Sequence, residues 1–276
     1  MSASTSIQFQ AVKESGWRRG LGNLLRGEFS AWFKSSRWWK QLILWFSIIN
    51  VMMVIMITAS AQAAEEGGEG PPILFMYGIF GGMFVAFGVM ILMQRVLIGE
   101  KSTGTAAWVL SKPVTRTAFV VSRLVVNSIA ILLTSVIVPG VLFYITLGLF
   151  SDLGWLSPLG FAAAIVMVSL HTLYWVTLVL MMGTLTESSA AVMAVPMALF
   201  FIFWLGPELI PFLIYVTIYV SPFLLIFSPI PEQLNSLAGS FMTGAPVFSW
   251  WPLISTLVSC VVFIAVAIWR FNRQEF

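Results

Sequence analysis

The sequence predicts an all-α integral membrane protein. We expect six transmembrane helices, an N-terminal amphipathic interfacial helix and an outer re-entrant hairpin before the last span. The first observation is composition, because 59% of the residues are hydrophobic and 9% are charged. Soluble domains are about 25% charged. The second is a series of apolar runs of roughly 20 residues, the length that crosses a bilayer as a helix. The third is the distribution of charge along the chain.

All 14 Lys and Arg residues can be placed on one side of a membrane. They precede the first apolar run, occupy one polar loop with its flanks, or follow the last run. The segments left for the other side carry carboxylates and no cation: Glu65, Glu66, Glu69, Asp152, Glu208 and Glu232. Cytoplasmic loops retain Lys and Arg. We therefore expect a multi-pass protein of the cell (inner or plasma) membrane, with cytoplasmic N- and C-termini and an even number of crossings.

Residues 1–41 form the predicted cytoplasmic N-terminus with an amphipathic helix, and residues 42–276 the predicted six-helix transmembrane domain. Within 16–41, apolar residues recur at spacings of three and four among cations, which is typical of a helix lying in the membrane interface. Trp38 and Trp39 are expected at the bend into the bilayer. The candidate interfacial residues are Arg26, Glu28, Phe29, Trp32, Trp38 and Trp39. The alternative is a soluble basic arm, because four glycines weaken the helix.

The first two spans are expected at about 42–61 and 73–94, joined by an acidic outer loop. Gly78 and Gly82 give the second span a small-xxx-small spacing that permits close helix contact, so they are a possible dimer face. The third span, about 118–150, is longer than a crossing requires. It either projects into the cytoplasm or is broken at Pro139-Gly140.

The fourth and fifth spans are expected at about 158–183 and 190–206, and the sixth at about 250–269. Residues 207–231 are apolar but contain five prolines. Counting them as a crossing would place the cations after the last span outside. The even number of crossings therefore predicts an outer re-entrant or interfacial hairpin, whose backbone must be covered by protein or water.

Several kinds of site are not expected on this chain. His171 is the single histidine, and a metal site or an acid–base pair needs partners. We expect it to be a hydrogen-bonded helix contact. Glu100 stands directly before Lys101, where a phosphate-binding loop needs glycine. We therefore predict no catalytic, metal or cofactor-binding residues here and no nucleic-acid partner, because lipid and topology account for the basic residues.

The polar loop 95–117 carries the most specific pattern. It contains Glu100, then Gly104-Thr105, then an apolar stretch ending in Leu110-Ser111, then Pro113-Val114-Thr115-Arg116. This pattern resembles the first cytoplasmic loop of ABC-2 type permeases, with Thr115 in place of the usual serine. The basic segment from Leu24 and the stretch Tyr219–Phe223 are similar to that family's elbow helix and its outer Ser-Pro-Phe stretch, so the resemblance covers nearly the whole chain.

The residues themselves predict a helix over Glu100–Leu110, capped by Ser102 or Thr103. Pro113 should end it, because proline disfavours helix at the residue before it. A rigid helix–turn held between two spans can act as a lever. The candidate coupling residues are Glu100, Gly104, Thr105, Leu110, Ser111, Pro113, Val114 and Arg116. The bland alternative is an ordinary solvated connector.

The resemblance implies a permease subunit of an ATP-binding cassette transporter that is not itself an enzyme. It implies separate ATPase subunits, which would bind ATP and Mg, and a second permease copy or paralogue in a dimer. Export of a hydrophobic or amphipathic substrate suits the apolar spans. Three rivals stay open: a membrane scaffold or sensor coupled to an ATPase without cargo, an ATP-independent secondary transporter or channel, and an intramembrane enzyme. The second would usually need ionisable residues within the spans.

Overall fold

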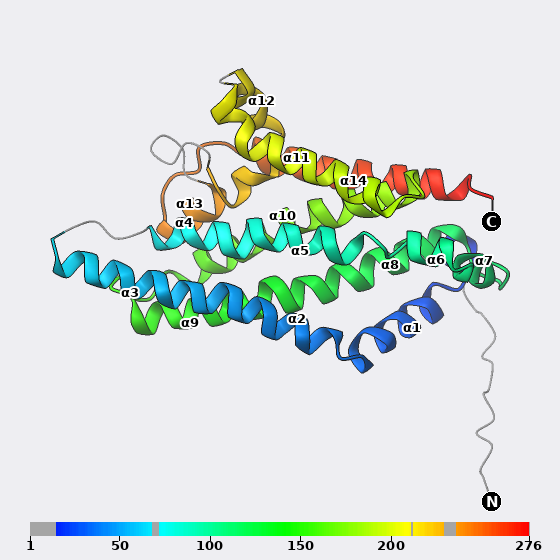
Figure 1. Ribbon diagram of the computed structural model, residues 1–276, viewed down its shortest axis with the longest axis horizontal. Helices are drawn as coiled ribbons and strands as arrows, with labels where there is room; N and C mark the ends of the chain where they lie inside the picture. Colours follow the sequence, from blue (N-terminus) through cyan, green and yellow to red (C-terminus); the bar gives the residue numbers. More distant parts are fainter. Residues whose placement is uncertain (1–14, 68–71, 211, 229–235, 276) are drawn as a thin grey trace, which may run out of the picture.

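The computed structural model describes residues 15–67, 72–210, 212–228 and 236–275 (Figure 1). This part of the chain contains helices and connecting segments and no strand. Six of its helices are long and apolar enough to cross a membrane, as the sequence predicts. They are Arg37–Glu65, Ile73–Ser102, Arg116–Phe150, Pro158–Leu185, Ser189–Pro207 and Trp251–Asn272.

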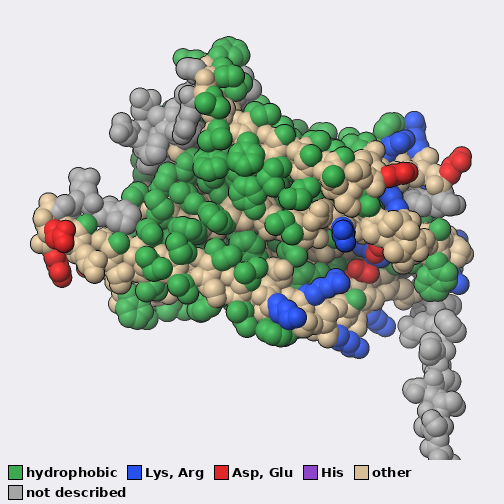
Figure 2. Space-filling model, viewed as in Figure 1, with side chains coloured by type: hydrophobic (Ala, Val, Ile, Leu, Met, Phe, Trp, Pro, Cys, Tyr) green, Lys and Arg blue, Asp and Glu red, His purple; other side chains and the backbone are tan. Residues whose placement is uncertain are grey.

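The long helices run roughly along the longest axis of the molecule, and the two ends of the described chain lie at the same end of the bundle (Figure 1). Lys and Arg side chains gather at that end, which we call the cation-rich end (Figure 2). Acidic side chains lie at the opposite end, where α3 finishes. Both ends of the described chain therefore lie at one end of the bundle, as the charge distribution predicts. That this end is cytoplasmic stays a prediction.

The N-terminal segment forms two helices rather than one. Helix α1 (Leu21–Lys34) is followed by a change of direction at Ser35 and Ser36. Helix α2 (Arg37–Phe46) then continues through a π-helical turn (Ser47–Val51) into α3 (Met52–Glu65). The domain boundary expected after residue 41 thus falls inside α2. Trp38 and Trp39 lie exposed on the first turn of α2, just past the bend.

The second and third spanning helices also contain π turns. The second consists of α4 (Ile73–Gly78), a π turn (Ile79–Met83) and α5 (Phe84–Met93), followed by a turn and α6 (Ile98–Ser102). The third consists of α8 (Arg116–Ile131), a π turn (Leu132–Ile137) and α9 (Val138–Phe150). The π turn of the second spanning helix contacts the π turns of the first and third spanning helices. Three wider helical turns therefore adjoin one another inside the bundle.

The third helix is not broken at Pro139-Gly140. A proline ring clashes with the carbonyl four residues earlier in an α-helix, and here that carbonyl belongs to Ser135, inside the π turn. The wider turn accommodates the ring, and the chain stays helical over 35 residues. At 1.5 Å per residue such a helix is about 52 Å long, against about 30 Å of hydrocarbon. The break at Pro139-Gly140 is therefore wrong, and projection of this helix into the cytoplasm stays a prediction.

Helix α10 (Pro158–Leu185) is the most buried of the six and contacts α5, α8, α11, α13 and α14. Ser157 caps its first turn by accepting from the Gly160 amide at 3.3 Å. His171 lies at its centre, fully buried. Trp175 Nε1 donates to His171 Nε2 at 3.1 Å, and His171 Nδ1 lies 3.1 Å from the Pro222 carbonyl oxygen. The expected hydrogen-bonded helix contact is confirmed.

The predicted hairpin region begins with helix, because α11 (Ser189–Leu209) continues through Pro207. Helix α12 (Phe212–Val220) follows, and at nine residues it is about 14 Å long, too short to cross. A buried 3₁₀ turn (Pro222–Leu225) then packs against α10 and α14. Residues 211 and 229–231 lie outside the described residues, so re-entry into a membrane stays a prediction. Helices α13 (Leu237–Thr243) and α14 (Trp251–Asn272) complete the fold.

The glycine pair of the second span contacts its own chain. Gly78 and Gly82 are both buried. A Cβ atom at Gly78 would collide with the Ile226 carbonyl oxygen, and one at Gly82 with the Ile226 side chain. The interpretation of this pair as a dimer face is therefore wrong. The glycines let the segment after the 3₁₀ turn approach the helix backbone within one chain.

Candidate functional site

The polar loop contains two short helices instead of one. Helix α6 ends at Ser102, and α7 (Thr105–Leu110) begins after Gly104, whose φ of 72° lies in the left-handed region that glycine tolerates best. The Thr103 hydroxyl donates to the Gly99 carbonyl at 2.8 Å, and neither α6 nor α7 has a side-chain cap. The expectation of one capped helix is wrong, because these hydroxyls bind carbonyls at the end of α6.

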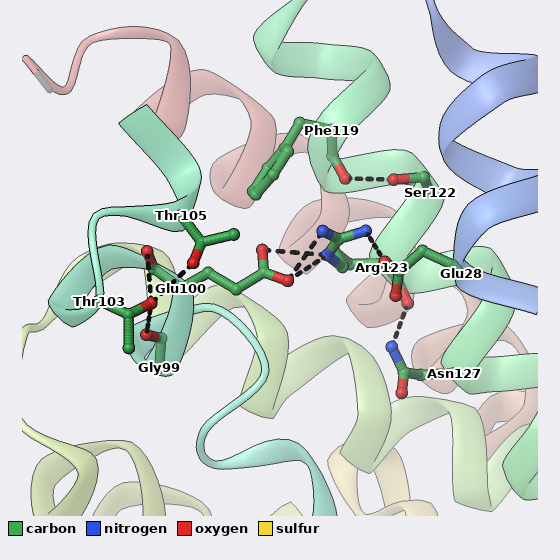
Figure 3. A network of polar contacts seen from close by, with 9 residues as sticks. All are labelled: Glu28, Gly99, Glu100, Thr103, Thr105, Phe119, Ser122, Arg123 and Asn127. Atoms are coloured by element: carbon green, nitrogen blue, oxygen red, sulfur yellow. Dashed lines mark hydrogen bonds and ion pairs between the residues drawn. The ribbon is translucent and has the colours of Figure 1, made fainter. Parts of the chain in front are cut away.

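The centre of the site is Arg123, on the second turn of α8 (Figure 3). Its Nε donates to Glu100 Oε1 at 2.9 Å and to Oε2 at 3.1 Å, and Nη2 lies 2.8 Å from Glu100 Oε1. Nη1 lies 2.7 Å from Glu28 Oε1. Figure 3 shows the two carboxylates approaching the guanidinium from opposite sides. One side chain of α8 thus joins α6 to α1.

The surroundings of Arg123 explain why it needs two carboxylates. The residue is 4% exposed, and an arginine stays protonated in proteins. A buried cation without partners would cost several kcal/mol. Its guanidinium also lies over the Phe119 ring, 4.7 Å from the centroid. Nη1 is the guanidinium nitrogen that lacks a hydrogen bond, because its contact with Glu28 is an ion pair without hydrogen-bond geometry.

The elbow residues contribute one face to this network. Glu28 contacts Arg123, and Trp32 Nε1 donates to Asn127 Oδ1 at 3.3 Å. Asn127 Nδ2 in turn donates to the Arg123 carbonyl at 2.8 Å. Phe29 stacks on Phe33, with centroids 6.2 Å apart. Arg26 is exposed. Helix α1 is therefore held on α8 by polar contacts, and its placement in a membrane interface stays a prediction.

The loop is also tied to α10 and α14. Lys101 Nζ donates to the Gly183 carbonyl at 2.9 Å, which joins α6 to the last turn of α10. Arg116 Nη1 donates to the Asn272 carbonyl at 2.7 Å, which joins the start of α8 to the end of α14. Thr115 caps α8 by accepting from the Ala118 amide at 3.1 Å. The loop and its flanks thus contact four helices at the cation-rich end.

These contacts change how the predicted coupling residues are interpreted. Glu100 and Arg116 are the two charged coupling candidates, and both bind groups of this chain. The exposed coupling candidates are Gly104, Thr105, Ser111 and Pro113. Leu110, Val114 and Arg116 are partly buried.

Sequence reasoning missed two residues of the site. Arg123 was grouped with the loop cations, yet it stands six residues inside the expected third span, and an ionisable residue there demands a partner. The position of Arg123 within this span is the sequence signal that could have identified it. Trp108 was not singled out, because it lies within an apolar stretch of the loop. Its side chain is 65% exposed, and Lys112 Nζ lies 5.2 Å from its ring centroid.

The arrangement is a set of polar contacts that hold helix ends together. Within the described ranges, no group of three or more His, Cys, Asp or Glu side chains could hold a metal ion. The network consists of ion pairs and hydrogen bonds between helix ends, with an exposed aromatic residue on the loop that they hold. Such a site can receive a push at the loop and pass it to several helices.

Comparison with known proteins identifies the family. A search of curated proteins gave no significant match. Residues 23–276 match the family model described as ABC-2 family transporter protein. This match covers the six candidate spans, α1 and the polar loop. The chain is therefore a membrane permease domain and belongs to the ABC-2 family of transporter proteins.

Proposed function

We propose that this chain couples ATP hydrolysis on a separate ATPase subunit to export of a hydrophobic or amphipathic substrate. In this proposal the chain is non-catalytic, and ATP and Mg bind to the partner. Two permease copies, or one copy and a paralogue, would form the pathway. The cation-rich end would face the cytoplasm of a cell with this protein in its inner or plasma membrane.

The observation that carries the proposal is the set of bonds around the loop. Lys101 connects α6 to α10, and Glu100 connects it to α8 and, through Arg123, to α1. A force on the loop would therefore reach three helices through short polar contacts instead of dissipating in a flexible connector. The Arg116 bond to the Asn272 carbonyl adds α14 to the same assembly.

The surface that would meet the ATPase is the outer side of α7 and the turn after it. Trp108, Ser111 and Pro113 are exposed there, and Ala106 on the inner side is buried. Tryptophan is enriched among the few residues that dominate binding at protein interfaces. An exposed tryptophan beside a lysine on a rigid loop is therefore the group we assign to the contact.

The test is Trp108→Ala, with co-purification of the ATPase subunit as the measurement. A central interfacial tryptophan contributes about 2 kcal/mol or more, so we expect at least about 30-fold weaker association. The matched control is Trp269→Ala, because Trp269 is 52% exposed and also carries a cation, with Arg273 Cζ 4.5 Å from its ring centroid. Equal retention of the ATPase by both variants would reject the assigned contact.

Reconstitution separates the remaining functions. The complex in liposomes should hydrolyse ATP faster when cargo is present, and flux should require ATP. ATP hydrolysis by the complex without any flux of cargo would identify a scaffold or sensor. Flux without any ATPase would identify a secondary transporter. Either result would contradict the proposal.

A further inference from the structure

A cavity at the cation-rich end lies apart from the proposed ATPase contact, because Trp108, Ser111 and Pro113 do not line it. It has a volume of about 610 Å³ and lies between α2 and α5, with α8 at its base and α1 at one side. Polar and apolar residues divide its lining. Ile91, Leu92, Val96 and Ile131 form an apolar wall, and the charged lining residues come from α1, α2, α6, α8 and the turn after α5.

The charge of this cavity favours an anion. Four cations and two carboxylates line it, so its formal net charge is +2. Both carboxylates, Glu28 and Glu100, already contact Arg123. The other three cations, Arg37, Lys40 and Arg95, are exposed and form no ion pair with the described residues. Figure 2 shows basic side chains over α2 and over the turn after α5, on both sides of the opening.

Two further hydrogen-bond donors in the cavity indicate an anion-binding site. Gln41 lines the cavity, and its Oε1 accepts from Trp45 Nε1 at 3.0 Å. Because the indole nitrogen can only donate, the amide oxygen must face it, and the Gln41 NH₂ group stays available. Arg123 also lines the cavity with its side chain 5% exposed, and its Nη1 forms no hydrogen bond within the described chain. An oxyanion in the cavity would satisfy both groups.

The apolar wall indicates what carries that anion. Ile91 is 55% exposed on α5, and Ile43 and Leu44 are exposed on the neighbouring helix α2. The cavity therefore opens onto hydrophobic surface that spanning helices present to lipid tails. A free phosphate ion would use the cations alone and leave this wall without a partner. A phospholipid uses both, with its phosphate among the cations and an acyl chain along the wall.

We propose that this cavity binds the phosphate headgroup of an anionic phospholipid from the leaflet at the cation-rich end. Arg37, Lys40 and Arg95 attract the phosphate, and Gln41 and Arg123 Nη1 donate hydrogen bonds to it. The lipid fills the gap between the elbow and the second spanning helix. This binding involves the permease chain alone, so it is independent of any ATPase contact.

The experiment uses the full chain in detergent, titrated with phosphatidylglycerol or with phosphatidylcholine of the same acyl chains, and native mass spectrometry to measure retained lipid. We expect phosphatidylglycerol to bind more tightly. The triple variant R37Q/K40Q/R95Q should lose about fivefold in affinity for each cation removed. The matched control R26Q/K34Q/K112Q removes three cations from the same end that do not line the cavity, and it should bind as the parent does.

Each other outcome overturns the proposal. Equal binding of the two lipids would exclude headgroup recognition. Equal losses in both triple variants would mean non-specific attraction to a basic surface. Displacement of phosphatidylglycerol by inorganic phosphate at similar concentration would assign the site to the free ion. Should the triple variant not fold, the single variant R95Q, at an exposed residue, gives the same comparison against R26Q.

Discussion

At the residue scale, one guanidinium organises the cation-rich end. Arg123 contacts Glu28 and Glu100, which belong to helices far apart in sequence. Removing one member of a buried ion pair costs far more than the pair contributes, because the remaining charge loses its partner. The carboxylates here are about one quarter exposed. Solvent therefore softens that penalty for them.

We predict that Arg123→Gln destabilises the protein by about 2–3 kcal/mol, below the 3–5 kcal/mol typical of fully buried pairs. Thermal unfolding in detergent is the measurement. Arg26→Gln is the control, because an exposed cation contributes about 0–1 kcal/mol. Adding Glu28→Gln and Glu100→Gln to the Arg123 variant should restore part of the loss. A melting temperature that Arg123→Gln leaves unchanged would show that the network does not stabilise the fold.

At the element scale, the second spanning helix packs closely against the segment after the 3₁₀ turn. Gly78 meets a carbonyl oxygen of the segment after the 3₁₀ turn, whereas Gly82 meets the end of the Ile226 side chain. A carbonyl in a packed segment cannot move independently of its chain. A side-chain terminus can change rotamer at lower cost. The two glycines therefore tolerate substitution differently.

We predict that Gly78→Ala destabilises by about 1–3 kcal/mol, as overpacking in a core does, and that Gly82→Ala costs less. Gly27→Ala is the control: no atom lies within 4 Å of its added Cβ. Alanine there should stabilise α1 by about 0.5–1 kcal/mol. Unfolding of monomeric protein gives all three values. An effect of Gly78→Ala that disappears in the monomer would restore the dimer-face interpretation.

At the whole-molecule scale, charge and helix length define an axis. The two termini and the basic residues share one end, and α3 delivers carboxylates to the other (Figures 1 and 2). Five of the spanning helices exceed the roughly 20 residues that a bilayer requires. The third helix carries Arg116 and Arg123 at its basic end. We therefore expect the loop that precedes it to lie outside the hydrocarbon.

We predict that single cysteines at Glu66 and Asp152 react with an impermeant thiol reagent added outside cells. Cysteines at Lys112 and Arg273 should react only after the membrane is opened. The background is Cys260→Ala, because the native thiol is buried. Reagent access at Lys112 in sealed cells would reverse the orientation. The same measurement at Glu232, which lies outside the described residues, tests whether the hairpin region is on the outer side.

The sequence was sufficient to predict the spans, because the length of an apolar run and the charge of a loop can be read from the chain itself. It was insufficient for contacts between distant segments. Nothing adjacent to Gly78 in sequence indicates that Ile226 fills its face, and nothing near Glu100 specifies Arg123 as its partner. Local chemistry also misled at Gly104. The sequence predicts one helix through this residue, yet its left-handed conformation divides the loop into two helices.

The adjoining π turns bear on how this chain tolerates changes in length. A turn closed by an i→i+5 bond holds one residue more than an α-helical turn. Each of the three turns therefore stores a surplus residue without rotating the helix faces on either side. Deleting one residue from the turn of the first or second spanning helix would leave an ordinary α-helix with both faces in register, whereas the same deletion elsewhere in those helices would turn one half out of phase. The turn of the third helix must stay, because it accommodates the ring of Pro139. We therefore expect relatives of this chain to keep the same bundle when they lack one residue in either of the first two turns.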